Sequence, residues 1–342
     1  MTRVAILGTG LIGSSIGLRL RERLPDVEVV GYDRAADIAS AAVRRGAIQR
    51  QHHTPAETVA GADVVILSAP VLSIRALMQE IADAVGPEAV ITDVGSTKRA
   101  VMEWAAEIFP GHPGFVGGHP MAGKTETGPK AADPALFEGA RWIVVPPPTA
   151  SEHAVATVTN LVDAAGAQLM FMDADEHDAY AAAVSHMPLM AAIALFSLER
   201  ASEAWPELSL MAAGGFRDMT RLSGTNPAMA FDIAATNRQH IVHWLDRYVG
   251  ALQELRRRVA DEAAEEDLYR LIAATEWEYT GFRAGNVGRV EKGGDAMSSV
   301  DGVGFGDFLA GSWVTDKLES LTREAEGRIA QRDAMDRARR NA

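Results

Sequence analysis

From residue 3 to about residue 172, short apolar runs alternate with segments whose apolar positions recur every three to four residues. Near-continuous runs of Val, Ile and Leu are typical of strands that are buried on both faces of a parallel sheet. The expected strands are RVAILG, EVVGYD, DVVILSAP, AVITDVG, GFVGG, RWIVVPP and QLMFMD. Strands that alternate with helices predict an α/β fold with a doubly wound sheet. A closed barrel is disfavoured, because it would need eight such units and about 250 residues.

After Asp173 the strand pattern stops and long helical stretches follow. Residues 183–198 are apolar on nearly every side and include Pro188, so we expect a buried, kinked helix. Such a helix needs apolar neighbours, and a second copy of the chain is an economical source of them, so we expect a homodimer through this domain. The expected domains are an α/β domain at 1–173, an all-helical substrate and dimerisation domain at 174–280, and a glycine-rich segment with a charged helical tail of unknown role at 281–342.

Charge and composition narrow the possible partners. The formal net charge is −13, whereas nucleic acids and anionic membranes attract clustered cations, so we expect neither as a partner. The chain has no cysteine, which excludes a disulfide, a thiolate zinc site and a cysteine nucleophile. We see no secretion signal and no apolar run of the roughly 20 residues that span a bilayer. A cytoplasmic location fits these observations.

A glycine-rich turn follows the first expected strand and precedes an amphipathic helix. Its three glycines have the spacing G-x-G-x-x-G, in which the first makes a tight turn, the second lets the backbone approach a pyrophosphate, and the third lets helix and strand pack closely. The candidate cofactor contacts here are Gly8, Gly10, Leu11, Ile12 and Gly13. The pattern indicates a Rossmann-type dinucleotide-binding domain. The alternative is a glycine turn without a ligand.

Asp33 ends the second expected strand, 20 residues after Gly13. A carboxylate at this position accepts hydrogen bonds from the adenosine ribose. Because Asp33 would repel a 2′-phosphate, we expect NAD rather than NADP as the cofactor. The adjacent Arg34 weakens this preference, since a guanidinium tolerates a phosphate.

Two more loops follow expected strands, at the edge where doubly wound sheets bind ligands. Ser68, Ala69 and Pro70 are expected beside the ribose and adenine of the cofactor. Ser96, in DVGSTK, is expected near the nicotinamide. Either serine could instead cap a helix, as Ser and Thr often do.

Two of the nine histidines stand out. His119 lies in the loop GGHPMAGKTETG after an expected strand, at the same edge, and a histidine titrates near neutral pH as a general base must. His186 lies in the apolar helix, where it is either a ligand contact or a core histidine bonded to a carbonyl group. The other seven, His177 among them, are expected mostly on solvated surfaces.

The segment GGFRDMTRLSGTNP brings Arg217, Asp218 and Arg221 together. On a helix the two arginines share a face, which suits forked hydrogen bonds to carboxylates. The alternative is a solvated pair bridged by Asp218.

Taken together, VAILGTGLIGSSIG, DVGSTK, GGHPMAG, VSHMPLMAAIAL and GGFRDMTRLSGTNP resemble the prephenate dehydrogenase family of tyrosine biosynthesis, over about four fifths of the chain. The resemblance implies NAD-dependent oxidative decarboxylation of prephenate to 4-hydroxyphenylpyruvate, in which aromatisation supplies the driving force, so we expect no metal. It implies that His119 draws the proton from the ring hydroxyl and that Ser96 assists it. It further implies that Arg221 holds a substrate carboxylate with Asp218 and Arg217 nearby, and that His186 faces the substrate.

Lys124 departs from the pattern of this family, in which a Ser or Thr, an acidic residue and then Lys commonly follow HPMAG. A cation so close to a dianionic substrate could strengthen binding, so Lys124 is a candidate substrate contact. The segment beyond about residue 280 does not resemble a regulatory ACT domain.

Three alternatives stay open. Arogenate differs from prephenate in few contacts, so an arogenate dehydrogenase is the closest. β-Hydroxyacid dehydrogenases share a catalytic lysine on the first long helix of the second domain. This chain has no lysine between Lys130 and Lys292, which counts against this alternative. A redox sensor that binds NAD without turnover would leave His119 and Arg221 without a role.

Overall fold

The computed structural model describes residues 2–124 and 126–285. Its sheet has eight strands: β1 (Arg3–Leu7), β2 (Glu28–Tyr32), β3 (Arg50–Gln51), β4 (Val64–Leu67), β5 (Val90–Asp93), β6 (Phe115–Pro120), β7 (Arg141–Val145) and β8 (Gln168–Phe171). Their order is β3-β2-β1-β4-β5-β6-β7-β8. Neighbouring strands are parallel except for β6 and β7, which are antiparallel.

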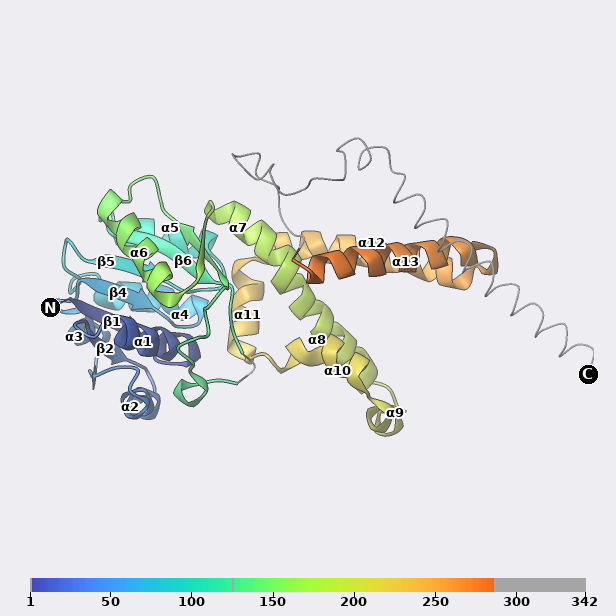
Figure 1. Cartoon of the computed structure of the whole chain (residues 1–342), viewed down its shortest axis with the longest axis horizontal. Coiled ribbons are helices and arrows are strands. Elements are labelled where there is room, and N and C mark those ends of the chain that lie inside the picture. The colour runs from blue at the N-terminus through green and yellow to red at the C-terminus, as the bar shows by residue number, and fades with distance from the viewer. Residues whose placement is uncertain (1, 125, 286–342) are drawn as a thin grey trace, which may run out of the picture. The chain divides into compact units, whose positions relative to one another are not determined.

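Helices cover both faces of this sheet (Figure 1). They are α1 (Leu11–Arg23), α2 (Ala36–Arg45), α3 (Pro55–Val59), α4 (Val71–Ile81), α5 (Arg99–Ile108) and α6 (Glu152–Ala165). Successive strand residues point to opposite faces, so Val4 and Ile6 pack with α1, α2 and α6, whereas Ala5 and Leu7 pack with α3, α4 and α5. The strands are therefore buried on both sides, and the expected doubly wound α/β fold is confirmed.

The remaining described elements are helical: α7 (Ala174–Ala181), a π-helical turn (Ala182–His186), α8 (Met187–Arg200), α9 (Trp205–Met211), α10 (Gly214–Thr220), a 3₁₀ turn (Arg221–Gly224), α11 (Pro227–Thr236), α12 (Arg238–Ala260) and α13 (Glu265–Arg283). The chain forms two compact units that divide between Asp246 and Arg247. Most of the expected glycine-rich segment and the charged tail, from residue 286 onward, lies outside the described residues.

Two acidic side chains of this helical part bind the N-termini of sheet helices. Asp232 of α11 accepts a hydrogen bond from the backbone N–H of Leu72 in α4 (2.9 Å). Asp178 of α7 accepts bonds from the backbone N–H groups of Lys98 and Arg99, where α5 begins (2.7 and 3.1 Å). Free N–H groups at a helix start favour a negative charge. The two carboxylates therefore hold α7 and α11 at the edge of the sheet where its parallel strands end.

The apolar helix that begins at Ala174 runs to Arg200 without a break. Pro188, at which a kink is expected, lies just after the π-helical turn. The expectation that residues 183–198 are buried all round is wrong within one chain: His186, Leu189 and Ala192 are buried, but Val184 is 71% and Leu198 69% exposed. Packing against Ile233 and Ile241 covers only one side.

The same helix corrects a second expectation. By length and composition alone it could cross a membrane, contrary to the prediction that no segment reaches that length. Core helices of soluble proteins have the same properties, and three buried polar residues, His177, Asp178 and His186, lie in this helix.

Candidate functional site

The glycine turn between β1 and α1 leaves room on one side only. Gly8 has a left-handed backbone (φ 99°), and a Cβ atom there would lie 2.1 Å from the carbonyl oxygen of Ser68. A Cβ atom on Gly13 would lie 2.1 Å from the carbonyl oxygen of Gly8. At Gly10, by contrast, a Cβ atom would meet no atom within 4 Å. Gly8 and Gly13 are thus required by packing, while Gly10 borders open space in front of the α1 N-terminus, which has no side-chain cap.

Asp33 follows β2 and reaches this turn. One carboxylate oxygen accepts a bond from the backbone N–H of Thr9 (2.9 Å), and the other accepts a bond from the N–H of Ala35 (3.0 Å). The oxygen that faces Thr9 also accepts a long bond from the Thr9 hydroxyl (3.4 Å), whereas the oxygen that faces Ala35 keeps a further lone pair for a ligand. Arg34 is exposed beside it.

The two serine loops lie at the same edge, and neither serine caps a helix. Pro70 occupies the N-cap position of α4 and Lys98 that of α5. Ser68 instead packs against the glycine turn, with its Oγ 3.1 Å from where a Gly13 Cβ would be. The Ser96 hydroxyl makes no hydrogen bond to any residue that the structure describes, so it is available to a ligand.

His119 lies in a strand rather than in the expected loop. β6 continues through Pro120, and His119 pairs with Ile143 of β7. The side chain is 8% exposed, and its Nδ1 atom lies 2.8 Å from Nε2 of His177. Burial lowers the pKa of His119 well below its usual range, and the neighbouring His177, Lys98 and His186 act in the same direction.

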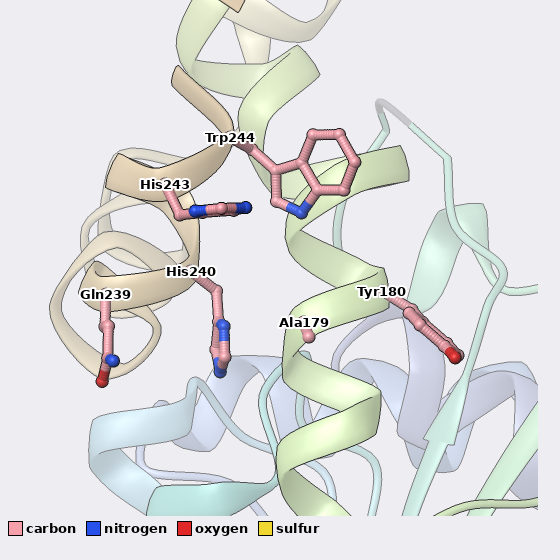
Figure 2. A pocket seen from close by; sticks show the side chains of 6 residues that line it. All are labelled: Ala179, Tyr180, Gln239, His240, His243 and Trp244. Carbon is pink, nitrogen blue, oxygen red and sulfur yellow. The ribbon is translucent and has the colours of Figure 1, made fainter. Parts of the chain in front are cut away.

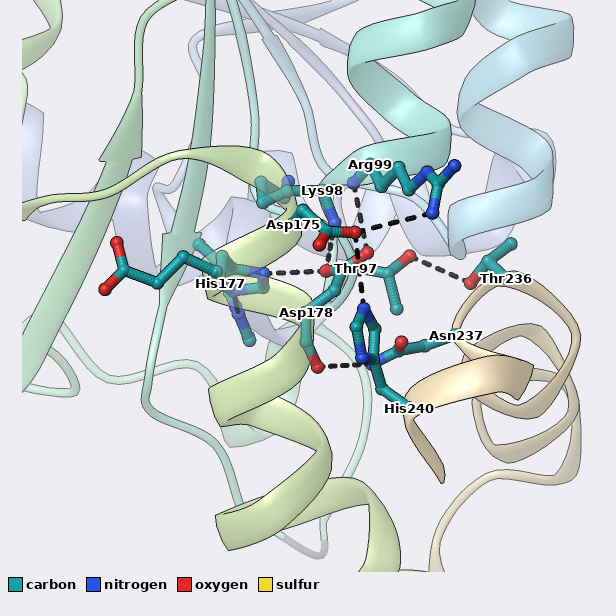
Figure 3. Close-up of polar contacts among 12 residues, drawn as sticks. Thr97, Lys98, Arg99, Asp175, His177, Asp178, Thr236, Asn237 and His240 are labelled. Carbon is teal, nitrogen blue, oxygen red and sulfur yellow. Dashed lines mark hydrogen bonds and ion pairs between the residues drawn. The ribbon is translucent and has the colours of Figure 1, made fainter. Parts of the chain in front are cut away.

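His177 and Asp178 extend this contact into a chain of hydrogen bonds (Figure 3). Nδ1 of His177 lies 2.8 Å from a carboxylate oxygen of Asp178. The two side chains are 2% and 1% exposed. The expectation that most histidines outside the site are solvated is therefore wrong for His177, because it lies where α7 packs against β6 and α5.

A buried ion pair lies next to His119. Lys98 and Asp93 are both fully buried and form an ion pair. The Lys98 ammonium also donates to the carbonyl oxygen of Gly118 (2.7 Å), and Asp93 accepts a bond from the Gly118 N–H (3.1 Å). Burial lowers the pKa of Lys98, an effect that Asp93 opposes. The pair thus holds both backbone groups of the residue before His119.

His186 lies in the π-helical turn and is fully buried. The side-chain amide nitrogen of Asn237 lies 3.0 Å from its Nδ1 atom and also donates to the backbone oxygen of Asp178 (2.7 Å). Nε2 of His186 makes no hydrogen bond of normal geometry to a described residue, although an interaction with the backbone of Ser96 acts to raise the pKa of His186. Burial lowers the pKa of His186 to about 4.

The predicted carboxylate grip is exposed. Arg217, Asp218 and Arg221 lie on α10 and the 3₁₀ turn after it. All three side chains are exposed. None of them forms an ion pair or hydrogen bond with another residue in the described parts of the chain. The alternative of an arginine pair bridged by Asp218 is therefore not seen. Lys124 pairs with Asp133 (2.8 Å).

A separate pocket of about 330 Å³ lies between α7 and the start of α12 (Figure 2). It is lined by Ala179, Tyr180, Gln239, His240, His243 and Trp244. None of these is a predicted site residue.

The sequence interpretation missed His177, Asp178 and Asn237, together with the Lys98–Asp93 pair. One signal was present in the helical period. Asp178, Ala182 and His186 are spaced four apart and lie on the packed face of the helix. A charged residue on an apolar helical face is rarely buried without a partner, so this spacing points to a polar cluster.

Two family models match the chain. The model described as "Prephenate dehydrogenase, nucleotide-binding domain" matches residues 16–171, and the one described as "Prephenate dehydrogenase, dimerization domain" matches residues 173–274. Among curated proteins, the prephenate dehydrogenase of Bacillus subtilis is 35% identical over 269 residues, which is 78% of this chain and 72% of that protein. The cyclohexadienyl dehydrogenase of Zymomonas mobilis is 30% identical over 76% of this chain and 89% of its own length.

Solved structures give the same result. The prephenate dehydrogenase of Aquifex aeolicus, in complex with hydroxyphenyl propionate and NAD⁺, matches with a TM-score of 0.76 and 27% identity, over 82% of this chain and 98% of that one. The arogenate dehydrogenase of Synechocystis matches with a TM-score of 0.68 and 26% identity, over 84% and 100% of the two chains.

Proposed function

Because this chain belongs to the prephenate dehydrogenase family of NAD-dependent oxidoreductases, we propose that it converts prephenate to 4-hydroxyphenylpyruvate and carbon dioxide in tyrosine biosynthesis. The observation that carries the proposal is the buried His119, a base kept neutral by its surroundings. It lies on the same sheet edge as the glycine turn.

The described residues fit NAD. Gly10 borders open space at the uncapped start of α1, where backbone N–H groups bind a pyrophosphate. Leu11 and Ile12 begin that helix, and Asp33 retains acceptor capacity for ribose hydroxyls. Further contacts are proposed for Gly8, Gly13, Arg34, Ser68, Ala69 and Pro70. The carboxylate of Asp33 favours NAD over NADP.

Bound NAD⁺ supplies the acceptor for the hydride that leaves C4 of the prephenate ring. His119 Nε2 draws the proton of the C4 hydroxyl while the bond from the ring to its carboxylate breaks and carbon dioxide departs. The electrons of that bond complete the aromatic ring, and the proton returns to the phenol oxygen. Ser96 orients the same hydroxyl. Alignment and electrostatics are therefore the main tasks of the protein.

The second task is to hold two carboxylates. Arg221 and Arg217 present guanidinium groups without competing partners in the described residues, with Asp218 between them. His186 offers a buried N–H at Nε2, because Nδ1 faces the donating amide of Asn237. Lys124 would have to leave Asp133 to contact the substrate.

Arogenate is the second candidate substrate. The relatives described as a cyclohexadienyl dehydrogenase and an arogenate dehydrogenase support it. The reacting ring is common to both substrates, so His119 and Ser96 would act alike on either.

We also propose a homodimer through the helical domain. The matched family description names a dimerization domain. Large apolar side chains are exposed on the helices from the π turn to α11; they include Val184, Leu198, Leu210, Met211 and Phe231. Sedimentation as a monomer at micromolar concentration would contradict this proposal. The division at Asp173 and a cytoplasmic location remain predictions.

The direct test is to incubate the purified full chain with NAD⁺ and prephenate, and separately with arogenate, while measuring NADH and carbon dioxide. We expect stoichiometric formation of both. His119→Asn should leave NAD⁺ affinity unchanged and lower kcat by about 10²- to 10⁴-fold, whereas Arg221→Ala should mainly raise KM. Absence of reduction with both substrates would refute the proposed function.

A further inference from the structure

The chain of bonds from His119 through His177 to Asp178 has a direction. We infer that His177 and Asp178 are positioning residues that fix the tautomer of His119, leaving Nε2 as the basic atom, and that Asp178 offsets the charge that the base gains. This inference rests on the proposed function for its catalytic meaning. The tautomer itself is a property of the protein alone.

The direction starts at Asp178. One carboxylate oxygen accepts the N–H of Lys98 and faces Nδ1 of His177, and the other accepts the N–H of Arg99. An ionised carboxylate only accepts hydrogen bonds, and the α5 N-terminus favours its negative charge. Nδ1 of His177 must therefore carry a proton and donate it.

The rest of the chain follows from the chemistry of a neutral imidazole. With its proton on Nδ1, His177 has a lone pair on Nε2. That lone pair faces Nδ1 of His119 at 2.8 Å, so Nδ1 of His119 carries the proton and donates. The free lone pair of His119 is then on Nε2, the nitrogen that does not contact His177.

Charge on the base needs compensation. His119, His177 and Asp178 are almost fully buried, and a buried cation without a partner is costly. When His119 takes up a proton, its Nδ1–H bond to His177 strengthens, and the carboxylate of Asp178 stabilises the imidazolium through His177. Other titratable and charged groups around the chain are Lys98, Asp93, His186, Arg99 and Asp175.

A purely structural role, in which these residues only hold α7 against β6, would not require a defined series of hydrogen-bond donors and acceptors. An apolar contact would join the two elements as well, and a buried polar network is stabilising only when every member has its partner. A purely structural role would not determine the tautomer of His119 or the acid limb of the pH profile of kcat/KM.

The first experiment needs no turnover. In the full chain with ¹⁵N-labelled histidine, the ring-nitrogen shifts of His119, assigned through the His119→Asn variant, should show a proton on Nδ1 and a bare Nε2. His177→Leu should remove this preference. A protonated Nε2 in the neutral ring of the parent protein would overturn the inference even if prephenate is not the substrate.

The second experiment measures kcat and KM. His177→Leu should lower kcat at least about 100-fold, since loss of the tautomer-setting partner in a comparable site costs up to about 10⁴-fold, while KM stays within a few fold. His177→Gln restores an acceptor oxygen near the position of Nε2 and should recover at least about tenfold of the loss. Equal activity of the Leu and Gln variants would overturn the inference.

Asp178→Asn removes the charge and keeps an amide oxygen that accepts from Lys98 and His177, although its amide nitrogen cannot accept the bond from the Arg99 N–H. We expect lower kcat and an acid limb of kcat/KM that moves to lower pH. The control is Thr236→Val, which removes the hydrogen bond between the Thr97 and Thr236 hydroxyl groups (2.8 Å). This bond joins the loop before α5 to α11 and involves none of His119, His177 and Asp178. The variant should keep the kcat and pH profile of the parent. An unmoved acid limb in Asp178→Asn would overturn the role of the charge. Loss of all activity in the parent would instead count against the proposed function.

Discussion

Acidification should destabilise the protein through His186. The ring is fully buried, its Nδ1 faces a donor from Asn237, and burial lowers its pKa from 6.5 to about 4. In the unfolded chain the ring takes up its proton near pH 6.5, so unfolding gains a proton at mildly acidic pH. The stabilising contribution of the neutral ring is complete above pH 6.5 and is lost as the pH falls towards 4. The difference amounts to about 2 kcal/mol at pH 5 and about 3 kcal/mol at the limit.

Urea unfolding at pH 7.5 and pH 5, followed by tryptophan fluorescence at fixed protomer concentration, measures this loss. His186→Asn keeps an acceptor near the position of Nδ1 but does not titrate. The variant should lose about 2 kcal/mol less than the parent between the two pH values. Protomer concentration must be constant because self-association changes apparent stability.

The exposed His153 of α6 provides the control. His153→Asn removes a histidine that is already in solvent, so its unfolding free energies should run parallel to those of the parent. Parallel curves for parent and His186→Asn would refute the reasoning, because they would mean that His186 is charged in the folded protein with little cost. Asp178 is the nearby anion that could achieve this.

The glycine turn and the buried ion pair give two further predictions. Gly10→Ala should keep the parent's thermal stability but weaken NAD⁺ binding in calorimetry, because the added methyl group occupies the open side of the turn; Gly13→Ala should lower the melting temperature, because its methyl group meets the Gly8 carbonyl oxygen, and equal behaviour of the two variants would contradict this distinction. Lys98→Met should lower the free energy of unfolding in urea by about 3–5 kcal/mol, since it leaves Asp93 buried without its partner, whereas a loss below about 1 kcal/mol would show that Asp93 becomes neutral.

The sequence predicts the doubly wound fold because each βα unit carries its own local signal. The direction of β7 needed a different argument. Among its described residues, the connection from Pro120 to Arg141 contains one 3₁₀ turn, Pro129–Ala131, and no α-helix. A parallel neighbour requires a crossover that is usually helical, so the chain returns beside β6 in the opposite direction. The apolar run RWIVVPP identifies a strand and is silent about its direction.

The candidate site likewise contains residues that a local motif predicts and residues that only the folded structure reveals. The glycine turn, Asp33 and His119 each lie in a short motif, and their chemistry can be interpreted locally. Asp178 cannot be interpreted so, because its partners at Lys98 and Asn237 are about 80 and 59 residues away in the sequence. Only the folded chain brings these three together.

This long-range junction has a consequence for how the site works. The carboxylate of Asp178 binds the start of α5, two residues after Ser96, and the ring of its neighbour His177 binds the base. Its backbone oxygen binds Asn237, which also binds His186. Ser96, His119 and His186 are therefore held in mutual register by one residue that contacts none of their proposed ligand atoms. A substitution of the Asp178 side chain should disturb Ser96 and His119 together, because both are reached through its carboxylate. His186 should stay in place, because it is reached through the backbone oxygen of Asp178.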